Sequence, residues 1–437
     1  MEYVCNLLHP HLLRIRSTSP SDDLILVSEG LYERLVASVG ALLTDALHPG
    51  NYMANEFLTL SDIAYEKMRL APSTTLTVWQ ILYADACILH ALCILNKPNA
   101  TRSIGILDKA IIIAGGGDEN RLDLILSCIN KIQQIFFPTL VLSRKLLHQG
   151  HHPSPNLLST AHHEVPTIDT EPSFLSFQEI HSKGPFVIRD YARDWPALKD
   201  HKWNSIDYLL SVSGSSRTIP IEVGHDYRDE DWSQTLMGWE DFLDVIREKV
   251  AGDSSFKVAK ILYLAQYNLL RQFPSLRNDI AIPDYVYCAL SSQDFPEYTA
   301  LRQGDNAILN AWLGPEGATS PAHFDPYYNL YVQIVGYKTV WLSPPNTKPY
   351  MEALTLLKRS EDIQTSLSER NSDSLNTSRI DVFNSGETTC NFSDFREKVV
   401  PEAMSVVLGP GDLLFFPPGW WHGMRSESTC FSVSMWF

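Results

Sequence analysis

The chain has 437 residues, of which 44% are hydrophobic and 20% are charged, values that are ordinary for a globular protein with roughly two or three domains. Its formal net charge of −16 argues against sequence-independent binding of nucleic acid, because such binding needs a basic face. The same acidity suits a partner with basic side chains, although it can equally serve solubility alone.

The cysteines and the apolar segments predict an intracellular protein without a membrane span. The seven cysteines are odd in number and form no Cys-x-x-Cys pair, which fits free thiols in a reducing compartment better than a disulfide framework. Residues 1–20 lack the charged-then-apolar pattern of a signal peptide. The longest apolar run, residues 78–95, contains Gln80, Asp85 and His90, so we interpret it as a buried helix.

The first third of the chain, residues 1–148, has the residue spacing of α-helices. Apolar residues recur every three or four positions over residues 24–47, 53–70, 74–95, 103–114 and 120–147. Lys97-Pro98-Asn99 and Gly115-Gly116-Gly117 mark turns between helices. We therefore predict a domain of antiparallel helical hairpins. It would be either a surface for a partner that the sequence does not identify or a cover for apolar surface of the following domain.

Residues 149–173 are rich in proline, serine and histidine and lack periodicity, which predicts a linker. The paired histidines at 151–152 and 162–163 could bind a metal ion, but solvated linker histidines are far more common. After this segment the chain changes from helical spacing to short apolar runs bounded by turn residues.

The last part, residues 174–437, mixes strands and helices. Apolar runs predict strands at 185–188, 218–223, 262–266, 306–313, 329–335, 338–343, 405–408, 413–416 and 430–437, and helices at 177–182, 239–249 and 269–276. An acidic cluster at 226–232 would either receive a basic side chain or simply be solvated. Polar residues 347–391 predict a long insertion of a kind often found near a site. Within it, residues 376–378 have the pattern of a glycosylation sequon, which an intracellular chain would not use.

A His-x-Asp motif is the feature around which this part of the chain is organised. Residues two apart on an extended chain point to the same side, so His323 and Asp325 can bind one metal ion together. His422, after a Pro-Pro-Gly break near the C-terminus, is the best candidate for a third ligand. One carboxylate and two imidazoles with open positions form the facial triad of non-haem Fe(II) oxygenases. Lys338 suits the far carboxylate of a dicarboxylic co-substrate.

These and neighbouring motifs resemble the Jumonji-C family of Fe(II)- and 2-oxoglutarate-dependent oxygenases. The motifs are DEDWSQTLM at 229–237, YLAQ at 263–266, AIPDY at 281–285, AWLGPEGATSPAHFDPYYN at 311–329, NTSRIDV at 376–382, GPGDLLFFPPGWWH at 409–422 and the terminal FSVSMWF. Within the family they look like the lysine demethylase 8 subgroup, also described as protein arginyl hydroxylases. The resemblance implies an α+β chain: an N-terminal helical domain, then a double-stranded β-helix (a cupin-like jelly roll) over residues 174–437.

The resemblance also implies roles for individual residues. The Fe(II) ligands would be His323, Asp325 and His422, and O2 would take a remaining position on the metal. The 2-oxoglutarate contacts would be Lys338, Ser320, Asn329 and Tyr263, with Trp436 lining the same pocket and Trp312 and Gln266 beside it. Elementary chemistry agrees, because a Lys ammonium pairs with a carboxylate and hydroxyl and amide groups can fill its remaining lone pairs.

The resemblance leaves the outcome of the reaction open. The first hypothesis is hydroxylation of a protein side chain, above all arginine, and the second is demethylation of histone methyl-lysine. The sequence shows no zinc-binding reader module and no basic chromatin-binding segment, which favours the hydroxylase. Tyr327, Tyr328 and Trp420 nevertheless lie near enough in sequence to form a methyl-lysine cage. A catalytically inactive Jumonji scaffold is the hypothesis of another class.

The resemblance and the composition together give three further expectations. The substrate would be a protein or a histone with basic side chains, without direct binding of nucleic acid or membrane. The protein would lie in the nucleus rather than the cytoplasm. Because no helical segment follows the last predicted strand, we expect a monomer.

Overall fold

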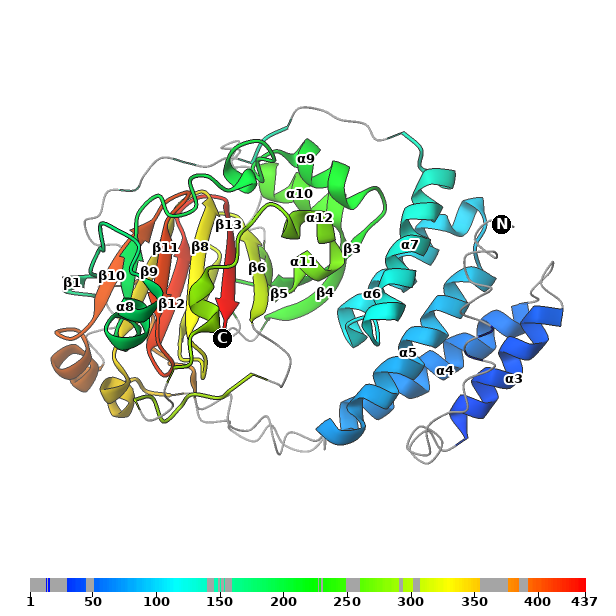
Figure 1. The fold of residues 1–437 in the computed structure, drawn as a ribbon, viewed down its shortest axis with the longest axis horizontal. Coiled ribbons are helices and arrows are strands. Elements are labelled where there is room, and N and C mark those ends of the chain that lie inside the picture. The colour runs from blue at the N-terminus through cyan, green and yellow to red at the C-terminus, as the bar shows by residue number, and fades with distance from the viewer. Residues whose placement is uncertain are drawn as a thin grey trace.

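The computed structural model describes residues 30–139, 145–147, 159–226, 231–248, 260–290, 294–301, 307–353, 376–384 and 392–437, together with residues 13, 15, 150, 153 and 228. Within these residues a helical N-terminal part is followed by two mainly antiparallel sheets (Figure 1). The predicted fold class, helices followed by a cupin-like jelly roll, is therefore confirmed.

The N-terminal helices pack in sequence order around one long apolar helix. They are α3 Leu31–Thr44, α4 Asn51–Leu70, α5 Ser73–Cys93, α6 Ala100–Ala114 and α7 Glu119–Phe136. Each helix contacts the next one along the chain, as expected for helical hairpins. By length and composition α5 could cross a membrane, but 61% of its most apolar stretch is buried inside the protein. That burial is typical of a core helix.

One of the predicted helices in this part ends earlier in the structure than predicted. The helix predicted over residues 120–147 ends at Phe136, because Pro138 disfavours helical backbone at Phe137, which has φ −132°. Leu146 instead makes an isolated β-bridge. Of the helix predicted over residues 24–47, residues 24–29 and 45–47 lie outside the described residues.

The C-terminal part folds as two sheets. The strands are β1 His163–Glu164, β2 Phe186–Ile188, β3 Thr218–Val223, β4 Ser233–Gly238, β5 Leu262–Tyr267, β6 Ile308–Gly314, β7 Thr319–His323, β8 Asn329–Val335, β9 Lys338–Ser343, β10 Met404–Leu408, β11 Leu413–Phe416, β12 Trp421–Ser426 and β13 Cys430–Trp436. One sheet has the strand order β1-β10-β9-β12-β7, and the other has the order β2-β11-β8-β13-β6-β5-β3-β4. Neighbouring strands that are distant in sequence give the jelly-roll topology.

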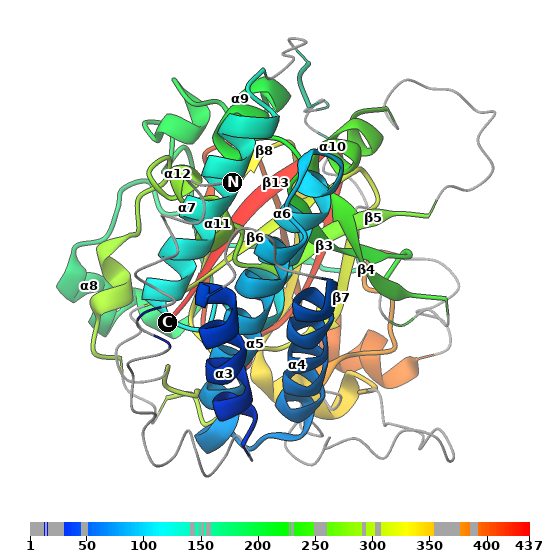
Figure 2. The ribbon, with the colours of Figure 1, turned by 90° about the vertical axis from the view of Figure 1, so that its right-hand side faces the viewer.

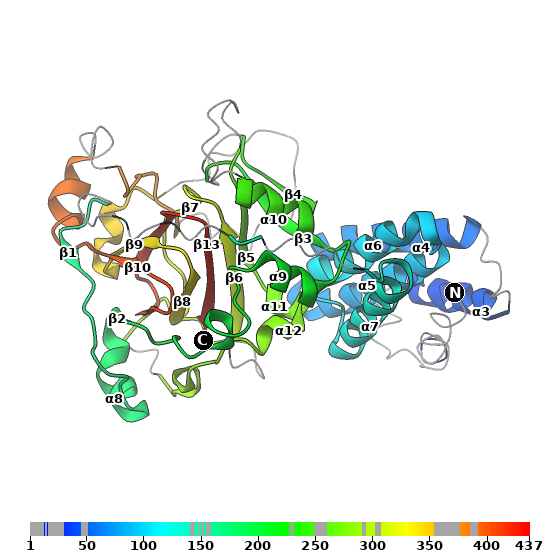
Figure 3. The ribbon, with the colours of Figure 1, turned by 90° about the horizontal axis from the view of Figure 1, so that it is seen from above.

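The inner faces of the two sheets enclose a core, and helices cover the outer face of the larger sheet. The inner core takes Val340 and Leu342 from β9 and Tyr331 and Phe416 from β8 and β11. The covering helices are α8 Phe174–Glu179, α9 Ile206–Ser213, α10 Trp239–Glu248, α11 Leu269–Gln272 and α12 Pro274–Arg277. Figure 3 shows α9 to α12 between the sheets and the N-terminal helices. This layering leaves the interior between the sheets for a site.

One further prediction needs correction against the structure, and the structure adds elements to those predicted. The single helix predicted over residues 269–276 is broken at Phe273, because Pro274 cannot continue a helix. The segment predicted as a linker contributes β1, which pairs in parallel with β10. Strands β4, β7 and β12 and helix α9 are additional elements that the sequence patterns did not predict. Most of the predicted insertion lies outside the described residues, which resume at residue 376.

Buried polar groups join the N-terminal helices to the jelly roll, and Figure 2 shows these helices lying across the sheet strands. Asp108 on α6 accepts hydrogen bonds from the guanidinium of Arg217 (2.7 Å) and from the backbone N–H of Thr218 (2.8 Å). It also accepts one from the side-chain amide of Gln272 (2.7 Å). Because Asp108 and Gln272 are fully buried and Arg217 is only 5% exposed, this is a desolvated ion pair with its hydrogen bonds satisfied.

Candidate metal centre and co-substrate pocket

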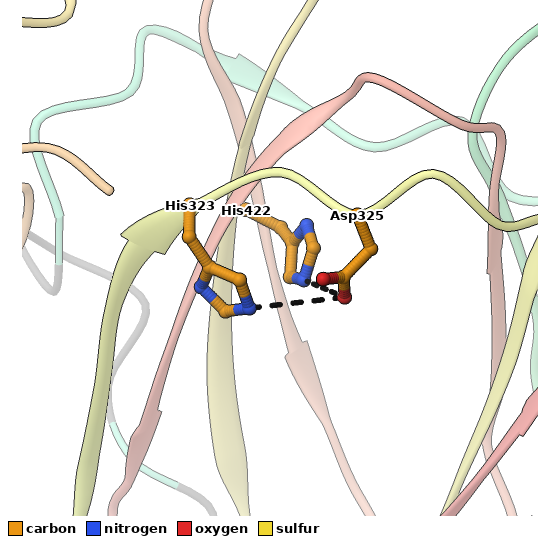
Figure 4. A group of neighbouring side chains, drawn as sticks. All are labelled: His323, Asp325 and His422. Atoms are coloured by element: carbon orange, nitrogen blue, oxygen red, sulfur yellow. Dashed lines mark ion pairs between the residues drawn. The ribbon is translucent and has the colours of Figure 1, made fainter. Parts of the chain in front are cut away.

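Two adjacent strands of the smaller sheet bring the three predicted metal ligands together. His323 ends β7 and is paired across the ladder with His422 on β12, so the two imidazoles lie on one face. Asp325 Oδ2 lies 3.8 Å from His323 Nε2 and 3.5 Å from His422 Nε2. The three ligand atoms lie within 4.8 Å of one another and point toward a common centre (Figure 4). This donor set suits Fe(II), and it is the only such cluster among the described residues.

Backbone carbonyls fix the tautomers of the two histidines. Nδ1 of His323 lies 2.7 Å from the carbonyl oxygen of Pro321, and Nδ1 of His422 lies 3.0 Å from that of Trp420. A carbonyl oxygen can only accept, so each Nδ1 carries the proton and each Nε2 keeps a free lone pair. Holding the ring through its second nitrogen is the usual way in which a protein orients a metal-binding histidine.

The electrostatics of the three side chains also suit a cation. Burial, together with the neighbouring His422, lowers the pKa of His323 to about 4. Burial alone would raise the pKa of the Asp325 carboxyl, but the two neighbouring histidines, His422 above all, bring it below its usual range. At neutral pH the site therefore presents an anionic carboxylate and a neutral His323, the forms that bind metals.

Lys338 occupies the interior of the jelly roll beside aromatic hydroxyl groups. Its Nζ donates to the hydroxyl oxygens of Tyr263 (3.2 Å) and Tyr331 (2.9 Å), and the Ser320 hydroxyl hydrogen-bonds Tyr263. Lys338 is 1% exposed, and no described carboxylate forms an ion pair with it. Burial raises the pKa of Tyr263 to about 12, so this phenol remains a neutral donor. The group is a buried cation with hydroxyl neighbours, which is what the predicted co-substrate pocket requires.

Two buried polar atoms near this pocket have no partner among the described residues. They are Oδ1 of Asn329 and Nε1 of Trp436, and the two residues are paired across β8 and β13. Buried polar atoms are normally hydrogen-bonded, so an acceptor and a donor left open on one face fit a site that a polar ligand completes. Trp312 packs against Tyr263, with ring centroids 6.2 Å apart, and its indole N–H donates to Ser434.

Gln266 is placed differently from the other predicted pocket residues. It is exposed and lies in a β-bulge between Leu264 and Tyr267, with φ 47°. Among the described residues it has no recorded hydrogen bond to the metal ligands or to Lys338. A bulge next to a site commonly redirects a side chain. We therefore still expect Gln266 to lie beside the site, and not among the residues that line the pocket.

The structure adds two residues that the sequence reasoning missed. Tyr331 lies two residues after Asn329 on β8, a spacing that places both side chains on one face. Glu222 on β3 is paired directly with Tyr263 on β5, so its carboxylate lies on the same face as the Tyr263 ring. An isolated acidic residue in the alternating run 218–223 was the available signal for Glu222.

In the other polar clusters that the sequence suggested, His163 and Asp226 form contacts within the protein. His163 Nε2 lies 2.8 Å from the carbonyl oxygen of Pro401, and residues 151–152 lie outside the described residues. In the acidic cluster, Asp226 is buried and accepts from Arg228 (2.7 Å), whereas residues 227, 229 and 230 lie outside the described residues. The described cysteines are free thiols, in agreement with the prediction.

Comparison with known proteins identifies the class. Residues 174–437 match the model of the cupin-like domain family. The chain is 34% identical to a Danio rerio protein named lysine-specific demethylase 8 over 86% of this chain and 85% of that protein. It is 35% identical to a Drosophila melanogaster protein named Jumonji C domain-containing protein 5 over 64% of this chain and 61% of that protein. A Homo sapiens protein named bifunctional peptidase and (3S)-lysyl hydroxylase JMJD7 is 22% identical over 62% of this chain and 84% of its own length.

These matches place the chain in a cupin-like class and, within it, in one enzyme family. The chain belongs to the Jumonji-C oxygenases, a family of 2-oxoglutarate-dependent enzymes that generally use Fe(II). The names of the relatives include both demethylases and a hydroxylase. The family of the chain is therefore established. Membership of this family does not determine which substrate bond is oxidised.

Proposed function

We propose that this chain binds Fe(II) through His323, Asp325 and His422 and hydroxylates a protein side chain, arginine in particular. The observation that carries the proposal is Lys338, a buried cation without a described carboxylate partner, on β9 beside the strand β12 that carries His422. Buried charges are normally paired, so the pocket is complete only when an anionic ligand enters. A dicarboxylate such as 2-oxoglutarate would place one carboxylate on Lys338 and leave its other end for the metal.

The protein's own contribution is binding and placement. When bound, the iron would supply the oxidative chemistry in which 2-oxoglutarate and O2 give succinate and CO2, and one oxygen atom enters a substrate C–H bond. Lys338 would neutralise the distal carboxylate, and the hydroxyl groups of Tyr263 and Ser320 would fill its remaining lone pairs. Asn329 and Trp436 would offer their open polar atoms to the same ligand or to water bound beside it.

Glu222 supports a basic substrate side chain. In β3 the neighbouring Ile221 packs on the outer side of the larger sheet, so Glu222 faces the interior with Tyr263. Burial raises the pKa of the Glu222 carboxyl, and a cation that enters the site would lower this pKa by pairing with the carboxylate. A guanidinium is the cation best matched to a carboxylate, because it can bind with two parallel hydrogen bonds.

The experiment that tests the proposal is turnover of 2-oxoglutarate to succinate with Fe(II) and O2 in the presence of arginine-containing and methyl-lysine histone peptides. A gain of about 16 Da on an unmethylated peptide, one oxygen atom, is the expected result. A loss of about 14 Da from a methylated peptide would make the chain a demethylase, the activity named for the Danio rerio relative. If metal binds but no succinate forms with any peptide, the scaffold hypothesis replaces both.

Lys338→Ala should weaken 2-oxoglutarate binding by ~1.5–3 kcal/mol, the effect of losing a hydrogen bond to a charged group. Calorimetric titration with Mn(II) in place of Fe(II) measures this without turnover. Lys199→Ala is the matched control, because the Lys199 side chain is more than half exposed and pairs with Asp194 at the surface. Equal 2-oxoglutarate affinity in both variants and the wild-type protein would remove Lys338 from the pocket.

Glu222→Gln should raise the KM for an arginine peptide by roughly tenfold, because the neutral amide forms a weaker bond with the guanidinium. The affinity for 2-oxoglutarate should stay unchanged, since Glu222 is not one of the groups proposed to hold it. Initial rates at varied peptide concentration, with saturating 2-oxoglutarate, give the KM. An unchanged peptide KM would exclude Glu222 as the receptor of the basic side chain.

A further inference from the structure

The strand that carries His323 lies at the edge of the smaller sheet, where one side of its backbone has no partner strand in the described part of the chain. The strand order ends in β7, whose neighbour on the inner side is β12. Residues 376–378, at the far end of the predicted insertion, cover the open side. Thr377 forms an isolated antiparallel bridge with His323, and the Ser378 N–H donates to the Ala322 carbonyl (2.8 Å). Covering an edge in this way satisfies its backbone groups.

Asn376 extends this contact beyond the strand to the residue between the two metal ligands. Its backbone carbonyl accepts from the N–H of Phe324 (3.1 Å), and its side-chain amide donates to the carbonyl of Phe324 (2.9 Å). The first of these groups belongs to the peptide bond after His323 and the second to the peptide bond before Asp325. One residue therefore holds both peptide groups that connect the two ligands.

A second backbone bond fixes the other side of the motif. The carbonyl of Asp325 accepts from the N–H of Gly419 (2.9 Å), in the turn that leads to His422. With Asn376 on one side and Gly419 on the other, the backbone through Phe324 and Asp325 is hydrogen-bonded at each of these three groups. Since Asp325 lies beyond the end of β7, no ladder pairing sets the direction of its carboxylate.

The segment that carries Asn376 is itself firmly anchored. Ser378 and Ile380 are fully buried and Val382 is 1% exposed, and the two apolar residues join a core with Trp341 and Trp421 on the outer face of the smaller sheet. The hydroxyl of Ser378 accepts from the Ile380 N–H and bonds the carbonyl of Met351. A rigid support of this kind is what a positioning residue needs in order to act on a metal site.

We propose that Asn376 is a positioning residue for the metal centre, holding the His323–Asp325 backbone so that the Asp325 carboxylate faces His422. The inference rests on the proposed function, because it assigns a role toward the metal that the triad would bind. It also assigns a structural role to the Asn-Thr-Ser sequence, which holds the His-x-Asp motif through hydrogen bonds and does not serve as a glycosylation signal. A hydrogen-bond donor is required in this side chain, because only a donor can bond the Phe324 carbonyl.

The test compares Asn376→Ala with Ser378→Ala in the full chain. Mn(II) affinity is measured by calorimetry, and the thermal midpoint is measured without metal. We expect Asn376→Ala to lose about 10- to 100-fold in Mn(II) affinity, the usual cost of removing a group that supports a metal ligand. Ser378→Ala should lower the thermal midpoint, because buried hydrogen bonds are lost, but should keep Mn(II) affinity within about twofold of wild type.

The outcomes separate this inference from the proposed function. If the wild-type protein binds Mn(II) and Asn376→Ala binds it equally well, the positioning role is wrong although the metal site stands. The role is also wrong if both variants lose Mn(II) affinity in proportion to their loss of thermal stability, because the segment then acts only as an edge cover. If the wild-type protein binds neither Mn(II) nor Fe(II), the proposed function itself fails and this inference fails with it.

Discussion

Replacing Asp325 with alanine is expected to reduce the formation of succinate by at least about 100-fold, since loss of a supporting group alone typically costs about 10- to 100-fold in metal affinity or activity. Asp325 is the single carboxylate of the cluster, and its Oδ2 is the atom that lies close to both histidines. Without it, two imidazoles remain, and they supply no negative charge to offset that of Fe(II).

The measurement is succinate by mass spectrometry together with bound metal by calorimetry, so that loss of metal and loss of chemistry are seen separately. Asp194→Ala is the matched control, because the Asp194 side chain is 69% exposed and pairs with Lys199 at the surface. Its succinate rate should equal that of the wild-type protein. If Asp325→Ala keeps more than a tenth of the wild-type rate, the triad is not the reaction centre.

The sequence predicts the bounds of β3, which alternates, and those of β8 and β9, which are buried on both faces. β8 and β9 begin and end at the predicted residues, because continuous apolar runs with a Gly-Tyr turn between them leave little choice of register. β7 was missed because Thr-Ser-Pro-Ala-His has neither alternation nor a long apolar run. Proline is tolerated there because β7 is an edge strand, and its edge position depends on the whole sheet.

In the candidate site too, the sequence predicts contacts between residues that are close in the chain and misses contacts between residues that are far apart. The spacing of His323 and Asp325 is local, so the sequence suffices to pair them. The pairing of Glu222 with Tyr263, and of Asn376 with Phe324, joins residues that are far apart in the chain. Such contacts come from strand order and from an insertion that folds back, and no periodicity in one stretch indicates them. Asn376 is part of a glycosylation sequon by its sequence pattern, and that pattern does not indicate that its half-buried side chain forms hydrogen bonds within the protein.

The largest effect on stability is expected from Asp108→Ala at the junction between the helices and the jelly roll. The change leaves the Arg217 guanidinium 5% exposed and without its carboxylate, and it frees the N–H of Thr218 and the amide of Gln272. Breaking a buried ion pair on one side costs about 3–5 kcal/mol, because the remaining charge stays desolvated. We therefore expect the free energy of unfolding in urea to fall by about this amount.

A control variant at a surface ion pair tests whether the large loss in the free energy of unfolding is due to burial of the Asp108–Arg217 pair. Glu66→Ala removes the partner of Arg69 on α4, where both side chains are exposed, and should cost about 0.5 kcal/mol or less. The double variant Asp108→Ala with Arg217→Met should be more stable than Asp108→Ala alone, because the unpaired charge is gone. If Asp108→Ala and Glu66→Ala lower the free energy of unfolding by the same amount, the Asp108–Arg217 pair does not hold the helices against the jelly roll. The expected difference would instead make the helical part a structural brace of the oxygenase, since the same network begins β3, the strand that carries Glu222.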